Sequence, residues 1–259
     1  MKSQAMGLYF PDIEHLLNWP GVLFEGSKYF ELNKVGIIYL WAMIAPVIIF
    51  TLAIRKSKLV PTGVQTIAES SVDFVRENVV MQTIGPDGMK FMPFLMSLFF
   101  FIFFSNITEV IPFIQLPGNA RMAAPAMLAL VVWVVFNAVG IKSQGFFKYF
   151  KNTIIPPGVP GALLPLVAVI EFVSTFFVRP FSLAVRLFAN MLAGHLLLVT
   201  FAVLSAALWD TSPLISIVWA PFVVLIGLTG FEVLVAFLQA FIFTILTAVY
   251  IGGALHPEH

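Results

Sequence analysis

The stretch "RPFSLAVRLFANMLAGHLLLVTF", residues 179–201, decides how this chain can fold. It places Arg186, Asn190 and His195 within an apolar run that continues on both sides. A charged side chain at the centre of a lipid bilayer costs about 3 kcal/mol on insertion scales, so such residues are rare and are functional by default. The stretch therefore predicts a membrane-buried helix whose polar residues serve a function.

The composition predicts an integral membrane protein. Of 259 residues, 60% are hydrophobic and 10% are charged, and the mean hydropathy is +0.98. Soluble domains carry roughly 25% charged residues. The net charge is only +1, so the chain has no overall positive charge that would favour binding to nucleic acid. The absence of cysteine excludes disulfides and cysteine-ligated metals. Residues 1–30 hold acids and prolines and no long apolar core, which is not the pattern of a cleavable signal peptide.

Three apolar runs have the length of ordinary transmembrane helices. At 1.5 Å per residue, about 20 residues cross a hydrocarbon core of roughly 30 Å. These spans are predicted at residues 35–54, 91–114 and 122–141. Between the first two, residues 64–81 place apolar side chains on one helical face and charged ones on the other. That pattern predicts an amphipathic helix on the membrane surface or against partner helices.

Two further apolar segments are too long for simple spans. They cover residues 162–209 and 214–254, and as single helices they would measure roughly 60–70 Å. Pro180 can kink a helix without ending it, so each segment is predicted as one strongly tilted helix. Between them, Ser212 can cap a helix that begins at Pro213. The predicted fold class is an all-α membrane protein in which two long antiparallel helices form a hairpin.

Basic residues set the predicted orientation. The loops at residues 55–90 and 142–151 are rich in lysine and arginine, whereas the opposite loops hold Arg121 alone. The positive-inside rule puts the basic loops in the cytoplasm. Residues 1–34 are then extracytoplasmic, and residues 255–259 form a cytoplasmic tail, a layout that fits a bacterial plasma membrane. Prolines and glycines in and after the second basic loop predict that it lacks a regular helix.

The polar residues of the apolar segments form separate stations and not one cluster. At 100° per residue, Arg186 and Asn190 share a helix face, whereas His195 points to the opposite face. Glu232 and Gln239 share a face of the last segment. Catalytic groups must lie within hydrogen-bond reach of one another, so the separation favours a proton path. Arg186 stays protonated and supplies a fixed charge, whereas His195 and Glu232 can titrate.

Three stretches resemble one known family. They are "RPFSLAVRLFANMLAGHLL", "FEVLVAFLQAFIFTILTAVYIGGAL" and "FFSNITEVIPF". Their residues and separation resemble the a subunit of F-type ATP synthases, over most of the chain from about residue 30. The resemblance implies a stator subunit that passes protons to and from a rotating c-ring. Further partners are the peripheral-stalk b subunits and the lipid bilayer. The ATP chemistry belongs to other subunits. The transported ion is mainly bound by the rotor, so the sequence of this chain does not distinguish H⁺ from the alternative, Na⁺.

The resemblance also implies roles for single residues. Arg186 matches the family's essential arginine, which faces the acidic c-ring, and Asn190 matches the asparagine one turn on. Gln239 matches the glutamine opposite that arginine. His195 and Glu232 match a pair that lines the outer half-channel, here with the histidine first and the acid second, the reverse of the order in some members.

The remaining matches belong to the two half-channels. Asn106 and Glu109 match polar residues near the mouth of the outer half-channel. Glu171, Ser174 and Ser182 match the inner half-channel, with Glu171 offset by one residue. The chain departs from the family at "MAAPAMLAL", where members often have an acid-containing polar stretch. The outer half-channel is therefore expected to be built differently there.

Several assignments have a structural alternative. The alternatives are an internal ion pair for Arg186, a packing role for His195, a structural pair with His195 for Glu232, interhelical hydrogen bonds for Asn190 and Gln239, and a solvated interfacial carboxylate for Glu109.

For the whole chain, the alternatives are a self-contained secondary transporter or ion channel, and a structural scaffold. A transporter of this kind is built from repeated halves with broken helices, which the sequence does not show. There is no G-x-x-x-x-G-K-[ST] loop, and the histidines of the tail lack a further ligand set. We therefore expect no cofactor, no metal and no nucleic acid.

Overall fold

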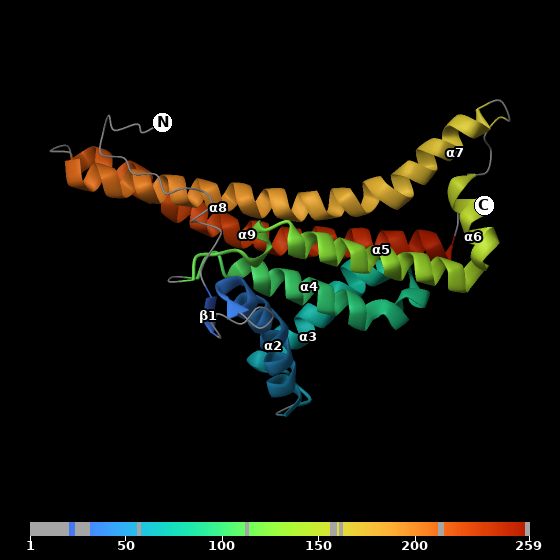
Figure 1. Cartoon of the computed structure of the whole chain (residues 1–259). Helices are drawn as coiled ribbons and strands as arrows, with labels where there is room; N and C mark the ends of the chain where they lie inside the picture. The colour runs from blue at the N-terminus through green and yellow to red at the C-terminus, as the bar shows by residue number, and fades with distance from the viewer. Residues whose placement is uncertain are drawn as a thin grey trace. The chain divides into compact units, whose positions relative to one another are not determined.

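The structure, a computed structural model, describes residues 21–23, 32–55, 58–111, 114–155, 160, 163–211 and 215–256, which are almost entirely helical (Figure 1). The chain groups into two compact units. Unit 1 holds Met1–Ile44, Phe101–Arg121 and Phe188–Gln239. Unit 2 holds Ala45–Phe100, Met122–Leu187 and Ala240–His259. The boundaries fall inside long helices, so several helices contribute residues to both units.

Five helices are long and apolar enough to cross a bilayer. They are Lys34–Arg55, Pro86–Ile107, Ala123–Gln144, Leu164–Ala207 and Trp219–Leu255. The shortest of them has 22 residues, about 33 Å of helix, and this exceeds the thickness of a hydrocarbon core. The predicted fold class, an all-α integral membrane protein, is confirmed.

The elements within these spans have the following bounds. They are α2 (Lys34–Arg55), η2 (Pro86–Phe91), α4 (Met92–Ile107), α5 (Ala123–Gln144), α7 (Leu164–Val173), η4 (Ser174–Val178), α8 (Arg179–Thr211) and α9 (Ile215–Leu255). Helix α4 ends at Ile107 and a turn follows it, whereas the sequence analysis carried this span to residue 114. Ser212 and Pro213, expected to cap the last helix, lie outside the described residues.

A short antiparallel strand pair precedes α2. Strand β1 (Gly21–Leu23) pairs with β2 (Leu32–Asn33), with Gly21 opposite Asn33. The Asn33 side-chain oxygen accepts a hydrogen bond of 2.9 Å from the Gly36 N–H, which is the role of a helix N-cap. The sequence analysis did not predict these strands, because two or three residues are too few to show an alternating pattern.

In unit 1, buried hydrogen bonds fix the turn that follows α4. Asn119 Nδ2 donates to Ser105 Oγ at 2.8 Å and to Asn106 Oδ1 at 2.7 Å. Thr108 Oγ1 donates to the carbonyl oxygens of Ser105 and Leu116, each at 2.9 Å. All these residues are buried, and such bonds are expensive to break without water to replace them. The loop after α4 is therefore held in one position against the helix end.

In unit 2, an amphipathic helix packs against the spans. Helix α3 (Val64–Val75) continues as a π-helical segment, η1 (Arg76–Met81). Its acidic residues are exposed, and Val75, Val79 and Val80 are buried. The Phe74 ring lies 6.1 Å from the Phe99 ring of α4 and 5.5 Å from the Phe241 ring of α9. The amphipathic segment therefore contacts other helices of the same chain through its apolar face.

The second basic loop contains a helix, so the prediction that it lacks one was wrong. Helix α6 (Phe146–Ile154) begins after Gly145, whose φ of 85° is a left-handed conformation that glycine adopts at little cost. Tyr149 is buried and donates a hydrogen bond of 3.1 Å to Asn137 Oδ1 of α5. Its ring fills a notch at Gly140, where an added Cβ would overlap the ring. Packing against α5 stabilises this short helix, and the sequence alone does not reveal that contact.

Helices α7 and α8 follow one another without a break through the π-helical turn η4. Pro180 has no N–H, and in a regular helix its ring would meet the carbonyl of Phe176. The wider π turn immediately before Pro180 relieves this clash. Figure 1 shows α7 leaving the line of α8 near this segment. The proline therefore deflects the long helix without ending it.

We expect Gly140→Ala to detach α6 from α5. The added methyl group overlaps the Tyr149 ring, and overpacking of a filled contact costs about 1–3 kcal/mol. The ring must then leave the notch and lose its hydrogen bond to Asn137. Trypsin should cut after Lys148 and Lys151 several times faster than in the unmodified, membrane-embedded protein.

The matched control is Gly253→Ala on α9, where an added Cβ meets nothing within 4 Å. This control should leave trypsin cleavage of α6 unchanged. Equal cleavage rates in Gly140→Ala and the unmodified protein would show that the notch does not hold α6.

Candidate functional site

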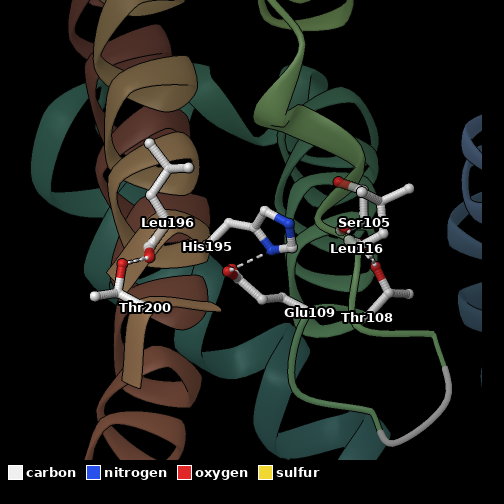
Figure 2. A network of polar contacts seen from close by, with 7 residues as sticks. All are labelled: Ser105, Thr108, Glu109, Leu116, His195, Leu196 and Thr200. Carbon is white, nitrogen blue, oxygen red and sulfur yellow. Dashed lines mark hydrogen bonds and ion pairs between the residues drawn. The ribbon is translucent and has the colours of Figure 1, made fainter. Parts of the chain in front are cut away.

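A buried pair of titratable side chains joins α8 to the turn after α4. In unit 1, His195 Nδ1 lies 3.6 Å from Glu109 Oε1, and Figure 2 shows the two side chains pointing toward one another. Their side chains are 7% and 2% exposed. Glu109 lies beyond the span that ends at Ile107. Burial raises the pKa of its carboxyl, and the neighbouring His195 acts in the opposite direction. A carboxyl and an imidazole at this distance can exchange a proton if the two side chains move slightly closer or if one water bridges them.

Glu232 of α9 lies beside the same part of α8. It is 3% exposed. An added Cβ at Gly194 would lie 2.5–2.7 Å from its carboxyl atoms, so glycine leaves room for this carboxyl next to His195 in the chain. Glu232 Oε2, Glu109 Oε1 and His195 Nε2 are buried atoms without a hydrogen-bond partner. Such atoms in a native structure indicate a position for water or a transferable proton.

A cavity of about 300 Å³ reaches this cluster within unit 1. Glu109 and His195 line it together with Lys34, Gln115 and Thr229, and the other lining residues are mostly apolar. Lys34 begins α2, Gln115 lies in the loop after α4, and Thr229 belongs to α9. This volume is large enough for several waters. The cavity can therefore supply water to the Glu109–His195 pair, whereas Glu232 is not among its lining residues.

Arg186 and Asn190 are exposed side chains on α8. Ala189 and Ala193 beside them are exposed as well. The span that contains them holds an 18-residue stretch with a mean hydropathy of 2.0, so a guanidinium on its surface is a marked exception. Small residues allow close approach of a neighbouring membrane helix. This face of α8 can therefore present a fixed positive charge to a helix of another protein, whereas His195 points into unit 1.

The other residues singled out from the sequence are not part of the Glu109–His195 cluster. Asn106 is buried in the last turn of α4, and its Nδ2 atom lacks a partner. Gln239 is 5% exposed and lies further along α9. Glu171, Ser174 and Ser182 are half-buried residues of unit 2, spaced along α7, η4 and the start of α8.

Comparisons with known proteins show the family of this chain. The family model described as ATP synthase A chain matches residues 37–252. This chain belongs to that family. It is 44% identical to ATP synthase subunit a of Rhodococcus erythropolis over 242 residues, 92% of this chain and 88% of the relative. It is 45% identical to ATP synthase subunit a of Frankia alni over 236 residues, 90% and 81% of the two chains.

Membership of the ATP synthase A chain family decides between the alternatives. The chain is a multi-pass subunit of the membrane sector of ATP synthase, takes part in proton transport for ATP synthesis, and is not itself catalytic. A self-contained secondary transporter and a structural scaffold are set aside. Its partners include other membrane-sector subunits of the complex.

The sequence analysis missed three residues of this region. Gly194 stands in the quoted motif, but its need for a missing Cβ becomes visible only with Glu232 beside it. Asn119 bonds Asn106 from a loop, and its only signal was an amide within "LPGNA". Lys34 lines the cavity from the start of α2 and carried no motif.

We expect Gly194→Ala to displace the Glu232 carboxyl. The new methyl group would lie too close to the carboxyl atoms, which form the flexible end of the side chain, so the fold should adjust. Passive proton flow through the membrane sector should fall about tenfold, equivalent to about 1.4 kcal/mol on the barrier. The measurement is the decay of a pH gradient in vesicles.

The control for this prediction is Gly227→Ala on α9, where an added Cβ meets nothing within 4 Å. It should conduct protons as the unmodified protein does. Unchanged flow in Gly194→Ala would mean that the position of the Glu232 carboxyl does not limit conduction.

Proposed function

We propose that this chain is the proton-channel stator subunit of an F-type ATP synthase, which couples proton flow to rotation of a c-ring. The observation that carries the proposal is the buried Glu109–His195 pair at a cavity in unit 1, at a distance of 3.6 Å. Titratable groups at successive depths serve proton transfer. Burying such a pair in a membrane protein costs free energy, so its presence indicates a function.

The outer half-channel uses the cavity and three titratable side chains. A proton arrives through water in the cavity and reaches Glu109, with Asn106 in the last turn of α4 just before it. It passes to His195 and on to Glu232, whose carboxyl lies against Gly194. Each transfer joins a carboxyl and an imidazole, which exchange protons readily near neutral pH. The last acceptor is a carboxylate of the c-ring.

Arg186 separates the two half-channels electrostatically. Its guanidinium keeps its proton at every physiological pH, so it cannot relay one. Exposed on α8, it attracts a deprotonated c-ring carboxylate and repels a free proton. Each charge that crosses the membrane potential yields about 2.3 kcal/mol per 100 mV, which drives the rotor. Asn190 on the same face and Gln239 on α9 support this position with neutral amides.

The inner half-channel lies near Glu171, Ser174 and Ser182. A c-ring carboxylate that has completed almost a full turn releases its proton there. The hydroxyls and the acid are half-buried and follow one continuous helix, so water can be led along them. Na⁺ remains the alternative coupling ion, because the rotor supplies most of its ligands.

The partners and orientation follow from the same proposal. The c-ring meets the exposed Arg186 face, and b subunits of the peripheral stalk bind elsewhere on the chain. The protein resides in a bacterial plasma membrane, with residues 1–34 outside and residues 255–259 in the cytoplasm, because the basic loops lie on the cytoplasmic side. Residues 35–254 act as one membrane domain.

Arg186→Ala should abolish ATP-driven proton pumping while the complex still assembles. Without the fixed charge, protons can pass directly between the half-channels, and hydrolysis no longer builds a gradient. The measurement is quenching of a pH-sensitive dye in inverted vesicles, with complex assembly checked on native gels. The matched control is Arg179→Gln, whose guanidinium lies 5.4 Å from the Tyr250 ring in unit 2. Retained coupled pumping in Arg186→Ala would contradict the role assigned here.

His195→Leu should slow passive proton flow by at least about tenfold more than Gln239→Glu does. Leucine removes a titratable stop, and tenfold corresponds to about 1.4 kcal/mol of barrier. Glutamate at position 239 keeps a polar, titratable group in place of the amide. Adding Glu109→Gln to His195→Leu should bring little further loss, since residues that act as a unit are not additive. Equal flow in the two single variants would remove His195 from the relay.

A further inference from the structure

Unit 2 holds a groove that the proton path does not use. Its volume is about 480 Å³. Its walls come from the ends of three helices. Lys90 and Phe91 stand at the beginning of the span Pro86–Ile107, Lys142 and Ser143 stand in the last turns of α5, and Leu255 ends α9. Pockets of a few hundred cubic ångströms are the size that binds a small ligand or part of a larger one.

The groove is cationic at one end and apolar along its side. Lys90 and Lys142 are exposed and supply the charge. No carboxylate stands among its described lining residues. The nearby acid Asp87 lies 3.3 Å from His256 in an ion pair, so its charge is already matched when the imidazole is protonated. The net charge at this end therefore favours an anion.

The helix ends that form the groove are fastened to one another. Gln144 Nε2 donates to the carbonyl oxygen of Ala254 at 2.8 Å, and Ser143 Oγ donates to the same oxygen at 3.2 Å. A backbone carbonyl oxygen in the last turn of α9 thus accepts hydrogen bonds from side chains of α5. In an isolated helix, water would have to supply these bonds. The groove is a preformed feature of unit 2 for this reason.

An exposed apolar track leads away from the lysines along α5. Ala138 lines the groove and is exposed. Val134 and Val131 follow at helical spacing and are 52% and 43% exposed. The ends of membrane spans lie at the level of lipid headgroups, and the helix between them faces acyl chains. A ligand that fits both parts has an anionic head and a hydrocarbon tail.

We propose that this groove binds an anionic phospholipid, with its phosphate between Lys90 and Lys142 and an acyl chain along Ala138 and Val134 of α5. Basic pockets between membrane helices bind anionic headgroups in this way. The groove shares no lining residue with the residues assigned to proton transfer and does not depend on their roles. It makes the lipid a structural ligand of the subunit.

Native mass spectrometry of the purified complex tests the site. The complex is titrated with dioleoylphosphatidylglycerol and, in parallel, with dioleoylphosphatidylcholine. The unmodified complex should retain phosphatidylglycerol preferentially. Lys90→Gln combined with Lys142→Gln should weaken its tightest binding by about thirtyfold, equivalent to about 2 kcal/mol. The matched control is Lys148→Gln combined with Lys151→Gln, which removes the same charge from the exposed side of α6 and should retain the lipid.

A second variant keeps the test decisive if the lysine variant does not assemble. Ala138→Trp fills the apolar part of the groove without changing any charge and should also release phosphatidylglycerol. Inorganic phosphate in excess should not displace the lipid, because it lacks the tail. Unchanged retention in the lysine variant or in Ala138→Trp, equal loss in the α6 control, or displacement by inorganic phosphate would each overturn the proposal.

Discussion

A titratable side chain inside an apolar protein is stable only where other polar groups or water share its space, and unit 1 is organised around this constraint. Glu109, His195 and Glu232 are all buried, and each keeps one polar atom without a hydrogen-bond partner. A buried polar atom left without any partner costs about 1–3 kcal/mol. Water from the adjoining cavity or a transferred proton can satisfy these atoms in turn. The same cost that makes the cluster unfavourable at rest makes it suitable for proton transfer.

Two interhelical contacts depend on a glycine that leaves room for a side chain of the neighbouring helix. At Gly194 of α8, the missing side chain makes room for the Glu232 carboxyl of α9. At Gly140 of α5, it makes room for the Tyr149 ring of α6. Helices in membranes pack through such small residues, because apolar side chains gain little by leaving lipid for protein. In one case the notch accommodates the Glu232 carboxyl, and in the other it holds a short helix against a span.

The exposed surface of the spans is mostly apolar, so its polar exceptions mark positions for partners. Arg186 and Asn190 form one exception, on a face of α8 with exposed alanines, and fit a partner helix that carries an acid. Lys90 and Lys142 form another, at helix ends beside an apolar track, and fit a lipid. A cation that faces lipid without a partner is unfavourable, and each exception therefore has a physical reason to be occupied.

The sequence by itself determined the fold class and the family. Hydropathy requires membrane-spanning helices, since in lipid the backbone must satisfy its own hydrogen bonds. The residues around Arg186 carry the resemblance to the family in the sequence itself. Local pattern did not predict α6, because its stability comes from the contact of Tyr149 with Gly140 and Asn137. It did not reveal that Glu109 faces His195 or that Gly194 accommodates Glu232. Periodicity reports the face of one helix only. Which faces meet is decided by tertiary packing, and the cluster of Glu109, His195 and Glu232 exists only where those faces come together.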